Sequence, residues 1–555
     1  MSKGASLNFK QHDLTSYLKS GSTHFSGMHA VTLRNIEACQ NLSKIVRTSM
    51  GPNGMNKIVV NHLEKLFISK DTATIMKELE VIHPAAKIIV LATQAQEQEA
   101  GDGTNFVCCF TGELLAQSET LIRMGLHIPD ILLGYKKAGA KALQVLETLG
   151  VKEVSDIRNL DEVTKSIGAT IGSKVLGMED FLAPLIAEAC ISVCPKTASR
   201  FNIDNIRTAK IPGGSVYDSK VLKGFAFVRD SEGSIKHVKN CKVAVYTCNI
   251  DQTSTETKNS VVIRSSEELL NYNLSEEKAM EEEIKAIADS GVKVIVSQGG
   301  FGEMALHFIE QHGMMAIKCP SKFQVQRLCQ AIGARMLVKL VPPTPDDMGT
   351  ASAVDITEIG DKKVALFQQA EDVDVSGIAT IIIRGATANV MDEVERAVDD
   401  GVNAFKSLAK DARLLAGAGA VEVALYNELS KYADETPGLE QYAIRKFAEA
   451  FLVVPRTLAE SAGLDSSIAI SNLTAAHAEG KTTWGIDISD ISGLDAKENN
   501  IFDLLSTKYW GVKLCTDAAI NILSVDQIIM ARPAGGPKMK NPNGNQHWDE
   551  QGEGL

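Results

Sequence analysis

The sequence lacks any pair of cysteines at C-x-x-C spacing, although ten cysteines are scattered over its 555 residues. This absence argues against a zinc site and against the disulfide framework of a secreted domain. No apolar run has the length needed to cross a membrane, and residues 1–27 are polar, unlike a signal peptide. We therefore expect a cytoplasmic protein with reduced thiols and no membrane partner.

Positive charge is in deficit, because the chain has 57 Lys and Arg residues but 69 Asp and Glu residues, which give a formal net charge of −12. A chain that holds nucleic acid by neutralising phosphates has the opposite balance, so we expect no nucleic-acid partner. The sequence also lacks the G-x-x-x-x-G-K-[S/T] phosphate loop. Its central part carries no Ser/His/Asp arrangement and no metal-ligand spacing.

The length of the chain is too great for one hydrophobic core and suggests about three domains. Helical spacing of apolar residues is common near both ends. Between residues 213 and 367, β-rich segments alternate with helical ones, which indicates an α/β domain with a partly parallel sheet. We expect a hairpin at 57–60 and 66–69, strands at 242–248, 292–297 and 314–318, and helices at 84–100, 131–149, 275–289, 302–312, 321–337, 441–463 (broken at Pro455) and 508–525.

The most informative stretch is Gly-Asp-Gly-Thr-Asn at residues 101–105, between two helical patterns. Its two glycines let the backbone bend sharply and approach a ligand. Thr104 is placed as a helix N-cap, and a helix start offers free N–H groups to an anion such as phosphate. Asp102 beside phosphates requires a cation between them, and Mg²⁺ is the usual one. A capped loop without a ligand is the alternative.

Similar turns lie elsewhere in the chain, at residues 50–57 and 416–420, and none lies in the central α/β part. If these turns form one site, the outer thirds of the chain fold together and the centre is inserted. Asp71, at a strand-to-helix junction, and Asp400, on an acidic helix, would then reach the same phosphates and orient a water for in-line attack. A helix cap and a solvated helix face are the alternatives for these two residues. Lys174 is either a phosphate-sensing cation or a surface lysine.

These stretches, in this order, resemble the group II chaperonins. Residues 51–57 match the family's GPxGMxK, 70–74 match NDGAT, 101–105 match GDGTT/N, and 417–422 lie on GGGAxE. The resemblance extends from residue 28 to about residue 537. Residues 61–67, 438–444 and 525–537 resemble one subunit type of the eukaryotic cytosolic chaperonin.

The resemblance implies an α/β multidomain chaperonin fold. Residues 1–150 and 405–555 would form a mostly helical, split equatorial domain that binds ATP, with a flexible tail at 538–555. Residues 151–215 and 370–404 would form a small intermediate hinge domain. Residues 216–369 would form an α/β apical domain that binds substrate, with a helical lid protrusion at about 249–275.

The resemblance also implies a function. ATP and Mg²⁺ would drive domain closure and lid shutting in a hetero-oligomeric double ring of paralogous subunits, which folds unfolded or nascent cytosolic proteins such as actin and tubulin. Asp102 would hold Mg²⁺, and Asp71 and Asp400 would flank the attacking water. The nucleotide would contact Met50, Gly51, Pro52, Gly103, Thr104, Asn105, Phe106, Gly172, Ser173, Lys174 and Gly417, with Asp503 at the ribose.

The sequence departs from the family pattern at four positions. Lys70 and Thr72 replace Asn and Gly, and Lys70 would pair with a catalytic carboxylate and weaken it. Ala416 and Ala418 replace Pro and Gly, and an alanine resists positive φ. These departures favour slow hydrolysis, so a subunit that holds nucleotide with little turnover is the alternative function. A free metabolic kinase is less favoured, because no second polar cluster suggests an acceptor site.

Overall fold

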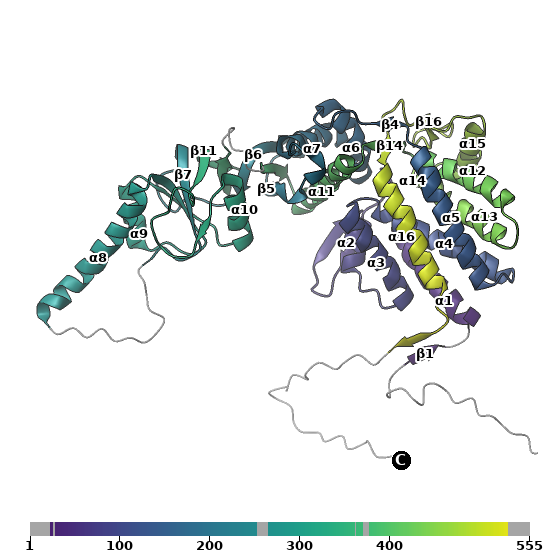
Figure 1. Ribbon diagram of the computed structural model, residues 1–555, viewed down its shortest axis with the longest axis horizontal. Coiled ribbons are helices and arrows are strands. Elements are labelled where there is room, and N and C mark those ends of the chain that lie inside the picture. The colour runs from purple at the N-terminus through teal and green to yellow at the C-terminus, as the bar shows by residue number, and fades with distance from the viewer. Residues whose placement is uncertain (1–22, 26–27, 252–264, 361, 370–376, 531–555) are drawn as a thin grey trace, which may run out of the picture.

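The computed structural model describes residues 23–25, 28–251, 265–360, 362–369 and 377–530. These residues form an elongated molecule with a helical body at one end and a sheet at the other (Figure 1). The predicted tail at 538–555 and residues 252–264 of the predicted protrusion lie outside the described residues. No described helix is both long and apolar enough to cross a membrane.

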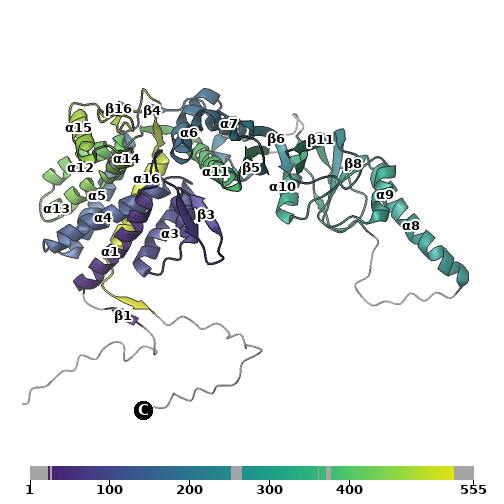
Figure 2. The ribbon, with the colours of Figure 1, turned by 180° about the vertical axis from the view of Figure 1, so that it is seen from behind.

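The helical body combines purple and blue N-terminal elements with green and yellow C-terminal ones (Figures 1 and 2). The N-terminal helices are α1 (Met28–Arg47), α2 (Thr72–Glu78), α3 (Pro84–Glu99), α4 (Thr104–Arg123) and α5 (Ile128–Thr148). The C-terminal helices are α12 (Ala420–Glu435), α13 (Glu440–Ala450), α14 (Val453–Ser461), α15 (Ser466–Ala478) and α16 (Leu505–Leu523). Both sets share one buried core, in which the ring centroids of Phe110 and Phe451 are 4.5 Å apart. The outer thirds therefore fold together.

Short strands complete the body. The hairpin of β2 (Lys57–Val60) and β3 (Leu66–Ser69) has the predicted bounds. The strands β1 (Thr23–Phe25) and β18 (Ile528–Met530) pair antiparallel and join the two ends of the chain. Residues 23–25 were expected to belong to a polar arm, because a three-residue strand leaves no periodic pattern. The small antiparallel pair β15 (Trp484–Gly485) and β16 (Leu494–Asp495) follows α15.

The middle part is formed by α6 (Leu160–Lys174), α7 (Glu179–Val193) and α11 (Ala388–Lys410), which share a second core. Here β4 (Lys152–Glu153), β14 (Arg413–Ala416) and β17 (Phe502–Leu504) form a three-stranded sheet in the order β17-β14-β4. The short helices η2 (Ala198–Arg200), η3 (Ile203–Asn205) and η4 (Val216–Asp218) and the parallel strands β5 (Ile206–Pro212) and β13 (Ala379–Gly385) lead to the distal sheet.

The distal sheet also contains β6 (Lys220–Phe227), β7 (His237–Tyr246), β8 (Val292–Ser297), β9 (Met315–Lys318), β10 (Met336–Leu337), β11 (Gly349–Ile359) and β12 (Lys362–Gln368). Its order is β5-β13-β6-β12-β11-β7-β8-β9, with β10 beside β7. The β7-β8-β9 pairs are parallel and the β6-β12-β11-β7 pairs antiparallel, which confirms the predicted partly parallel sheet. The helix α10 (Lys322–Ile332) shares a core with one face of this sheet, and α8 (Ser266–Asp289) and α9 (Glu303–Gln311) share a core with the other.

Several predicted boundaries are wrong. The strand β7 begins at His237, five residues before the predicted start at 242, and ends at Tyr246. The helix α8 begins at Ser266, nine residues before the predicted start at 275. The segment 321–337 is not one helix, because α10 ends at Ile332 and Gly333 takes a φ of 73°. The break expected at Pro455 lies earlier, between α13 and α14, and Pro455 is the third residue of α14, where its missing N–H costs no hydrogen bond.

Candidate functional site

Charged side chains from four separate segments meet where the helical body adjoins the middle part. Asp71 lies just before α2, Asp102 lies in the turn between α3 and α4, Lys174 ends α6, and Asp400 lies on α11. The ammonium nitrogen of Lys174 is 3.1 Å from Asp71 Oδ1 and 2.9 Å from Asp400 Oδ2. These three side chains are largely buried, with 11–14% of each exposed. The chain therefore brings its first third and its middle part to one polar centre.

Asp71 is both a helix cap and a member of this cluster. Its Oδ2 accepts hydrogen bonds from the backbone N–H and the hydroxyl of Thr74, each at 2.9 Å, as an N-cap residue does. Its Oδ1 accepts a hydrogen bond from the Thr104 hydroxyl at 3.1 Å and pairs with Lys174. The two interpretations of Asp71 are therefore compatible.

The turn before α4 differs from the prediction in one respect. Gly103, not Thr104, is the N-cap of α4, and its φ of 80° is one that glycine adopts without strain. Thr104 is the first helical residue, which leaves its hydroxyl to bind Asp71. Asp102 Oδ1 accepts the backbone N–H of Gly103 at 2.7 Å. Gln96 supports the turn by donating to the carbonyl of Asp102 at 2.9 Å.

Asn105 connects this turn to two earlier segments. Its Nδ2 donates to the carbonyls of Ser49 and Lys70 at 3.2 and 3.3 Å, and its Oδ1 accepts the backbone N–H of Thr72 at 3.1 Å. The ammonium of Lys70 donates to the Pro52 carbonyl at 3.3 Å. The expected pairing of Lys70 with a catalytic carboxylate is therefore wrong, because Lys174 takes that place beside Asp71.

The second glycine turn follows β14. Asp503 on β17 pairs with Leu415 on β14, and the N–H of Gly417 donates to the Ile501 carbonyl at 2.9 Å. Gly419 is the N-cap of α12 with a φ of 82°. Ala418 adopts a φ of 55° despite its side chain, so the turn keeps a left-handed residue at a local cost of about 1–2 kcal/mol.

The remaining predicted residues lie around the cluster. Met50 and Phe106 are buried in the body core, and Gly51 has a φ of 83° beside Leu458. Gly172 and Ser173 belong to the last turn of α6, and the Ser173 hydroxyl donates to the Thr170 carbonyl of its own helix.

The charged groups of the cluster change one another's protonation. Burial raises the pKa of Asp400 to about 8, although Lys174 opposes this shift. Burial also raises the pKa of Asp102, again against Lys174, and the charges of Asp503 and Asp71 add to the rise. For Asp71, burial is outweighed by Lys174 and Thr74, which hold its pKa below the usual range. Burial would lower the pKa of Lys174, but the surrounding carboxylates raise it. The single positive charge of Lys174 is therefore surrounded by three aspartates, Asp71, Asp102 and Asp400.

The donor set fits a magnesium ion that is bound together with phosphates. Buried Asp400 Oδ2 has no hydrogen-bond partner among the described residues, although it forms an ion pair with Lys174. Within the described ranges, no group of three His, Cys, Asp or Glu side chains is arranged to hold a metal alone. Magnesium usually takes one or two carboxylates, and phosphates and waters complete its shell.

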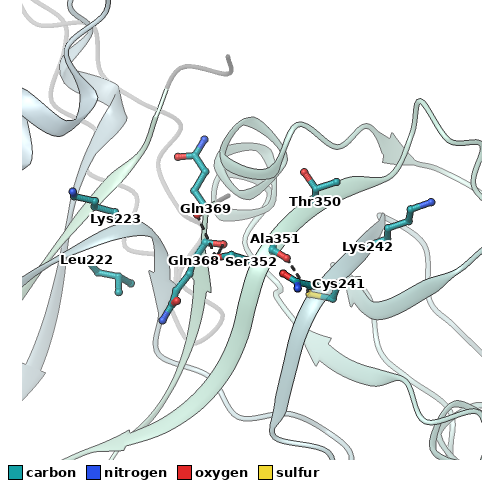
Figure 3. Close-up of a pocket in the computed structure, with 10 residues that line it drawn as sticks. Leu222, Lys223, Cys241, Lys242, Thr350, Ala351, Ser352, Gln368 and Gln369 are labelled. Carbon is teal, nitrogen blue, oxygen red and sulfur yellow. Dashed lines mark hydrogen bonds between the residues drawn. The ribbon is translucent and has the colours of Figure 1, made fainter. Parts of the chain in front are cut away.

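A cavity of about 700 Å³ lies elsewhere, on the distal sheet (Figure 3). Its lining includes Lys223, Lys242, Ser352, Gln368 and Gln369. It contains none of the predicted site residues and no carboxylate side chain. The cluster around Lys174 therefore remains the candidate site, because it alone gathers the predicted aspartates.

Three further residues near the cluster were not predicted. Gln96 is buried within α3, and its amide joins the carbonyls of Asp102 and Thr507. A polar residue on an apolar helix face was the available signal. Lys508 forms ion pairs with Asp503, at 3.1 Å, and with Glu422. No spacing in the sequence relates Glu422 to Lys508, because the contact joins two distant helices.

Comparisons with known proteins agree with the predicted resemblance. Residues 42–533 match the model of the TCP-1/cpn60 chaperonin family. The chain is 50% identical to "T-complex protein 1 subunit theta" of Dictyostelium discoideum over 95% of this chain and 97% of that protein. Its identity to the proteins of the same name is 48% in Gallus gallus and 47% in Homo sapiens, each over 96% of this chain and 97% of the relative. The predicted resemblance to the theta subunit of the eukaryotic cytosolic chaperonin and the predicted fold class are confirmed.

Proposed function

Because this chain belongs to the TCP-1/cpn60 chaperonin family, we propose that it is an ATP-hydrolysing subunit of a cytoplasmic, hetero-oligomeric double ring. Paralogous subunits are its partners, and its clients are unfolded cytosolic proteins of the actin and tubulin class. The equatorial, intermediate and apical domains have the boundaries given by the resemblance. Supporting this proposal, the relatives are named as subunits of a T-complex.

One observation carries the enzymatic part of the proposal: Asp71 and Asp400 reach the same lysine, and Asp102 is close enough for that lysine to act on its pKa. The aspartates come from three segments of the chain. Such a convergence is expected where a phosphoryl group is positioned and its charge neutralised. One carboxylate can hold magnesium together with the phosphates, and the other two are then available to orient a water.

Each residue then has a role that its contacts support. Mg²⁺ would neutralise charge on the phosphates, held by Asp102. The backbone N–H groups of Thr104, Asn105 and Phe106 at the start of α4 bind phosphate oxygens, as free helix starts do. The N–H of Gly103 donates to Asp102, and Gly103 contributes by letting the turn approach the phosphates closely. Lys174 adds a positive charge beside them. Asp71, kept ionised by Lys174 and Thr74, and Asp400 hold the attacking water. Asp503 accepts hydrogen bonds from the ribose.

Hydrolysis is coupled to the position of α11, because Asp400 belongs to that helix. Arg396, one turn before Asp400, donates to the Ile68 carbonyl of β3 at 3.0 Å. A Cβ at Gly101 would lie 2.2 Å from the side chain of Asn403, so α11 also packs against the turn before α4. Movement of the middle part would remove Asp400 from the site, and closure would complete it.

A second candidate, a subunit that holds nucleotide with little turnover, is favoured by the position of Lys174. Its ammonium lies between Asp71 and Asp400, where the attacking water would be held. If Lys174 keeps that position, nucleotide is retained without hydrolysis. Measuring nucleotide exchange on this subunit separates the two candidates, because fast exchange with turnover excludes the holding function.

The test uses assembled rings that carry Asp102→Ala or Asp400→Ala in this subunit alone. We expect Asp102→Ala to abolish magnesium-dependent photo-crosslinking of 8-azido-ATP to this subunit. Asp400→Ala should keep crosslinking and reduce ATP turnover and ring closure. Asp392→Ala is the control, because it lies on α11 but pairs with Lys210 away from the cluster. Unchanged crosslinking, turnover and closure in both site variants would exclude an active site here.

A further inference from the structure

Lys508 is a nearly buried cation that the roles described so far do not use. It lies in the first turn of α16, directly after β17. Its ammonium is 3.1 Å from Asp503 Oδ2, forms an ion pair with Glu422 Oε1, and lies 4.9 Å from the ring centroid of Phe106. It therefore joins three elements that border the proposed nucleotide site: the end of β17, the start of α12 and the start of α4.

The two carboxylates beside Lys508 differ in exposure. The side chain of Glu422 is 1% exposed, whereas that of Asp503 is 33% exposed. A buried pair such as Glu422–Lys508 adds little net stability, but the loss of one partner leaves a costly buried charge. Glu422 therefore serves to hold the ammonium in place. Asp503 is the accessible end of the group and the one that a ligand can reach.

Asp503 lies on the strand beside the second glycine turn and near Asp102. Its charge is close enough to Asp102 to raise the pKa of Asp102. Its backbone pairs with Leu415, two residues before Gly417. An aspartate beside a glycine turn and a phosphate site is suited to accept hydrogen bonds from ribose hydroxyls. Its carboxylate must be fixed in one orientation to do so.

We propose that Lys508 is the positioning residue that fixes Asp503 for the ribose, and that it makes this site select ribonucleotides over 2′-deoxyribonucleotides. This inference rests on the proposed nucleotide-binding function. Lys508 contacts Asp503 through one carboxylate oxygen, Oδ2. The held carboxylate then presents acceptors in a fixed direction. Without Lys508, Asp503 can rotate toward solvent and loses discrimination between the two sugars.

The experiment uses assembled rings with the double substitution Glu422→Gln and Lys508→Met, which removes the lysine without leaving a buried carboxylate unpaired. Photo-crosslinking of 8-azido-ATP to this subunit is competed with ATP or 2′-deoxy-ATP, so that each affinity belongs to this site. We expect wild-type rings to prefer ATP and the double variant to lose about tenfold or more of that preference, in line with a lost hydrogen bond to a charged group. Glu422→Gln alone should keep the preference, because the amide oxygen of the glutamine still accepts a hydrogen bond from Lys508 and holds its ammonium beside Asp503.

Other results overturn the inference. A double variant with the wild-type preference, or one that weakens both nucleotides equally, would show that Lys508 only holds helices together. Wild-type rings that bind both nucleotides equally would also overturn it, while leaving the proposed function intact. Absence of crosslinking in wild-type rings would overturn the proposed function itself. If the double variant does not assemble, Lys508→Arg serves instead, because its longer arm displaces Asp503 while it keeps the charge, and the same loss of preference is expected.

Discussion

Keeping the buried Asp400 carboxylate ionised costs free energy of folding, so stability should depend on pH. Burial raises its pKa from 3.8 to about 8, so the folded chain keeps a proton that the unfolded chain releases above pH 4. The stability that this proton provides is present below about pH 4 and is lost as the pH rises toward 8. Asp71 has a lowered pKa and behaves oppositely, because its contribution is lost only on acidification.

Asp400→Asn should therefore remove part of the pH dependence. At pH 8 and without nucleotide, we expect the free energy of unfolding of the variant to exceed that of wild type by an amount on the order of a few kcal/mol. The variant should therefore unfold at a higher temperature. At pH 5 the two should differ much less. Thermal unfolding curves between pH 5 and 8 measure this difference. Parallel curves for the two proteins would contradict the raised pKa.

Glycine 101 provides a second prediction at this scale, with a matched control. Gly101 and Gly125 both have positive φ, at 72° and 92°, but only Gly101 faces a neighbour, Asn403, at 2.2 Å from an added Cβ. Gly125→Ala should cost about 1–2 kcal/mol from backbone strain alone. Gly101→Ala should cost more and should also weaken 8-azido-ATP crosslinking, because α11 must move. Equal effects of the two substitutions on stability and crosslinking would contradict the contact between this turn and α11.

Some elements could be predicted from their own local sequence and others could not. The hairpin at 57–60 and 66–69 was predicted with its bounds because alternation and turn residues lie within one short window. The strand Thr23–Phe25 and its partner were not predicted as a pair. The partner, Ile528–Met530, lies at the other end of the chain, and three residues are too few to show a periodic pattern. Apolar periodicity is a local signal, whereas strand order and helix contacts depend on residues far apart in sequence.

The candidate site shows the same division. The turn at 101–105 and the strand-to-helix junction at Asp71 were visible as local patterns, and the family motifs suggested that they belong together. Gln96 and Lys508 were missed. Gln96 gave only one local signal, a polar residue on an apolar helix face, and its partners lie in other segments. Lys508 acts through a partner, Glu422, on another helix. Ala418 shows the opposite case, since the fold imposes a φ of 55° that its residue type disfavours.

At the scale of elements, α11 is held against the body by a bond that can be tested. Arg396 donates to the Ile68 carbonyl at 3.0 Å, one turn before Asp400. Arg396→Ala should shift the closed state toward the open one by about 0.5–1.5 kcal/mol, or roughly two- to tenfold. Protease protection of rings with saturating nucleotide measures the closed fraction. Lys410→Ala, at the exposed end of α11, is the control and should change nothing. Equal protection in Arg396→Ala and wild type would contradict this role of the bond.

For the whole molecule, separate cores predict separate unfolding. The body core joins Phe110 of α4 to Phe447 of α13, whereas Val294 belongs to a core of the distal sheet. Phe447→Ala should cost about 3–5 kcal/mol and raise hydrogen exchange in peptides from both outer thirds, such as α4 and α16. The same substitution should leave exchange in β7 and β8 near the wild-type level. Val294→Ala should raise hydrogen exchange in β7 and β8 and leave exchange in α4 and α16 near the wild-type level. It should also preserve 8-azido-ATP crosslinking. Uniform exchange across all peptides in either variant would mean that the body and the sheet unfold as one unit, and closure could not then rest on movement of one against the other.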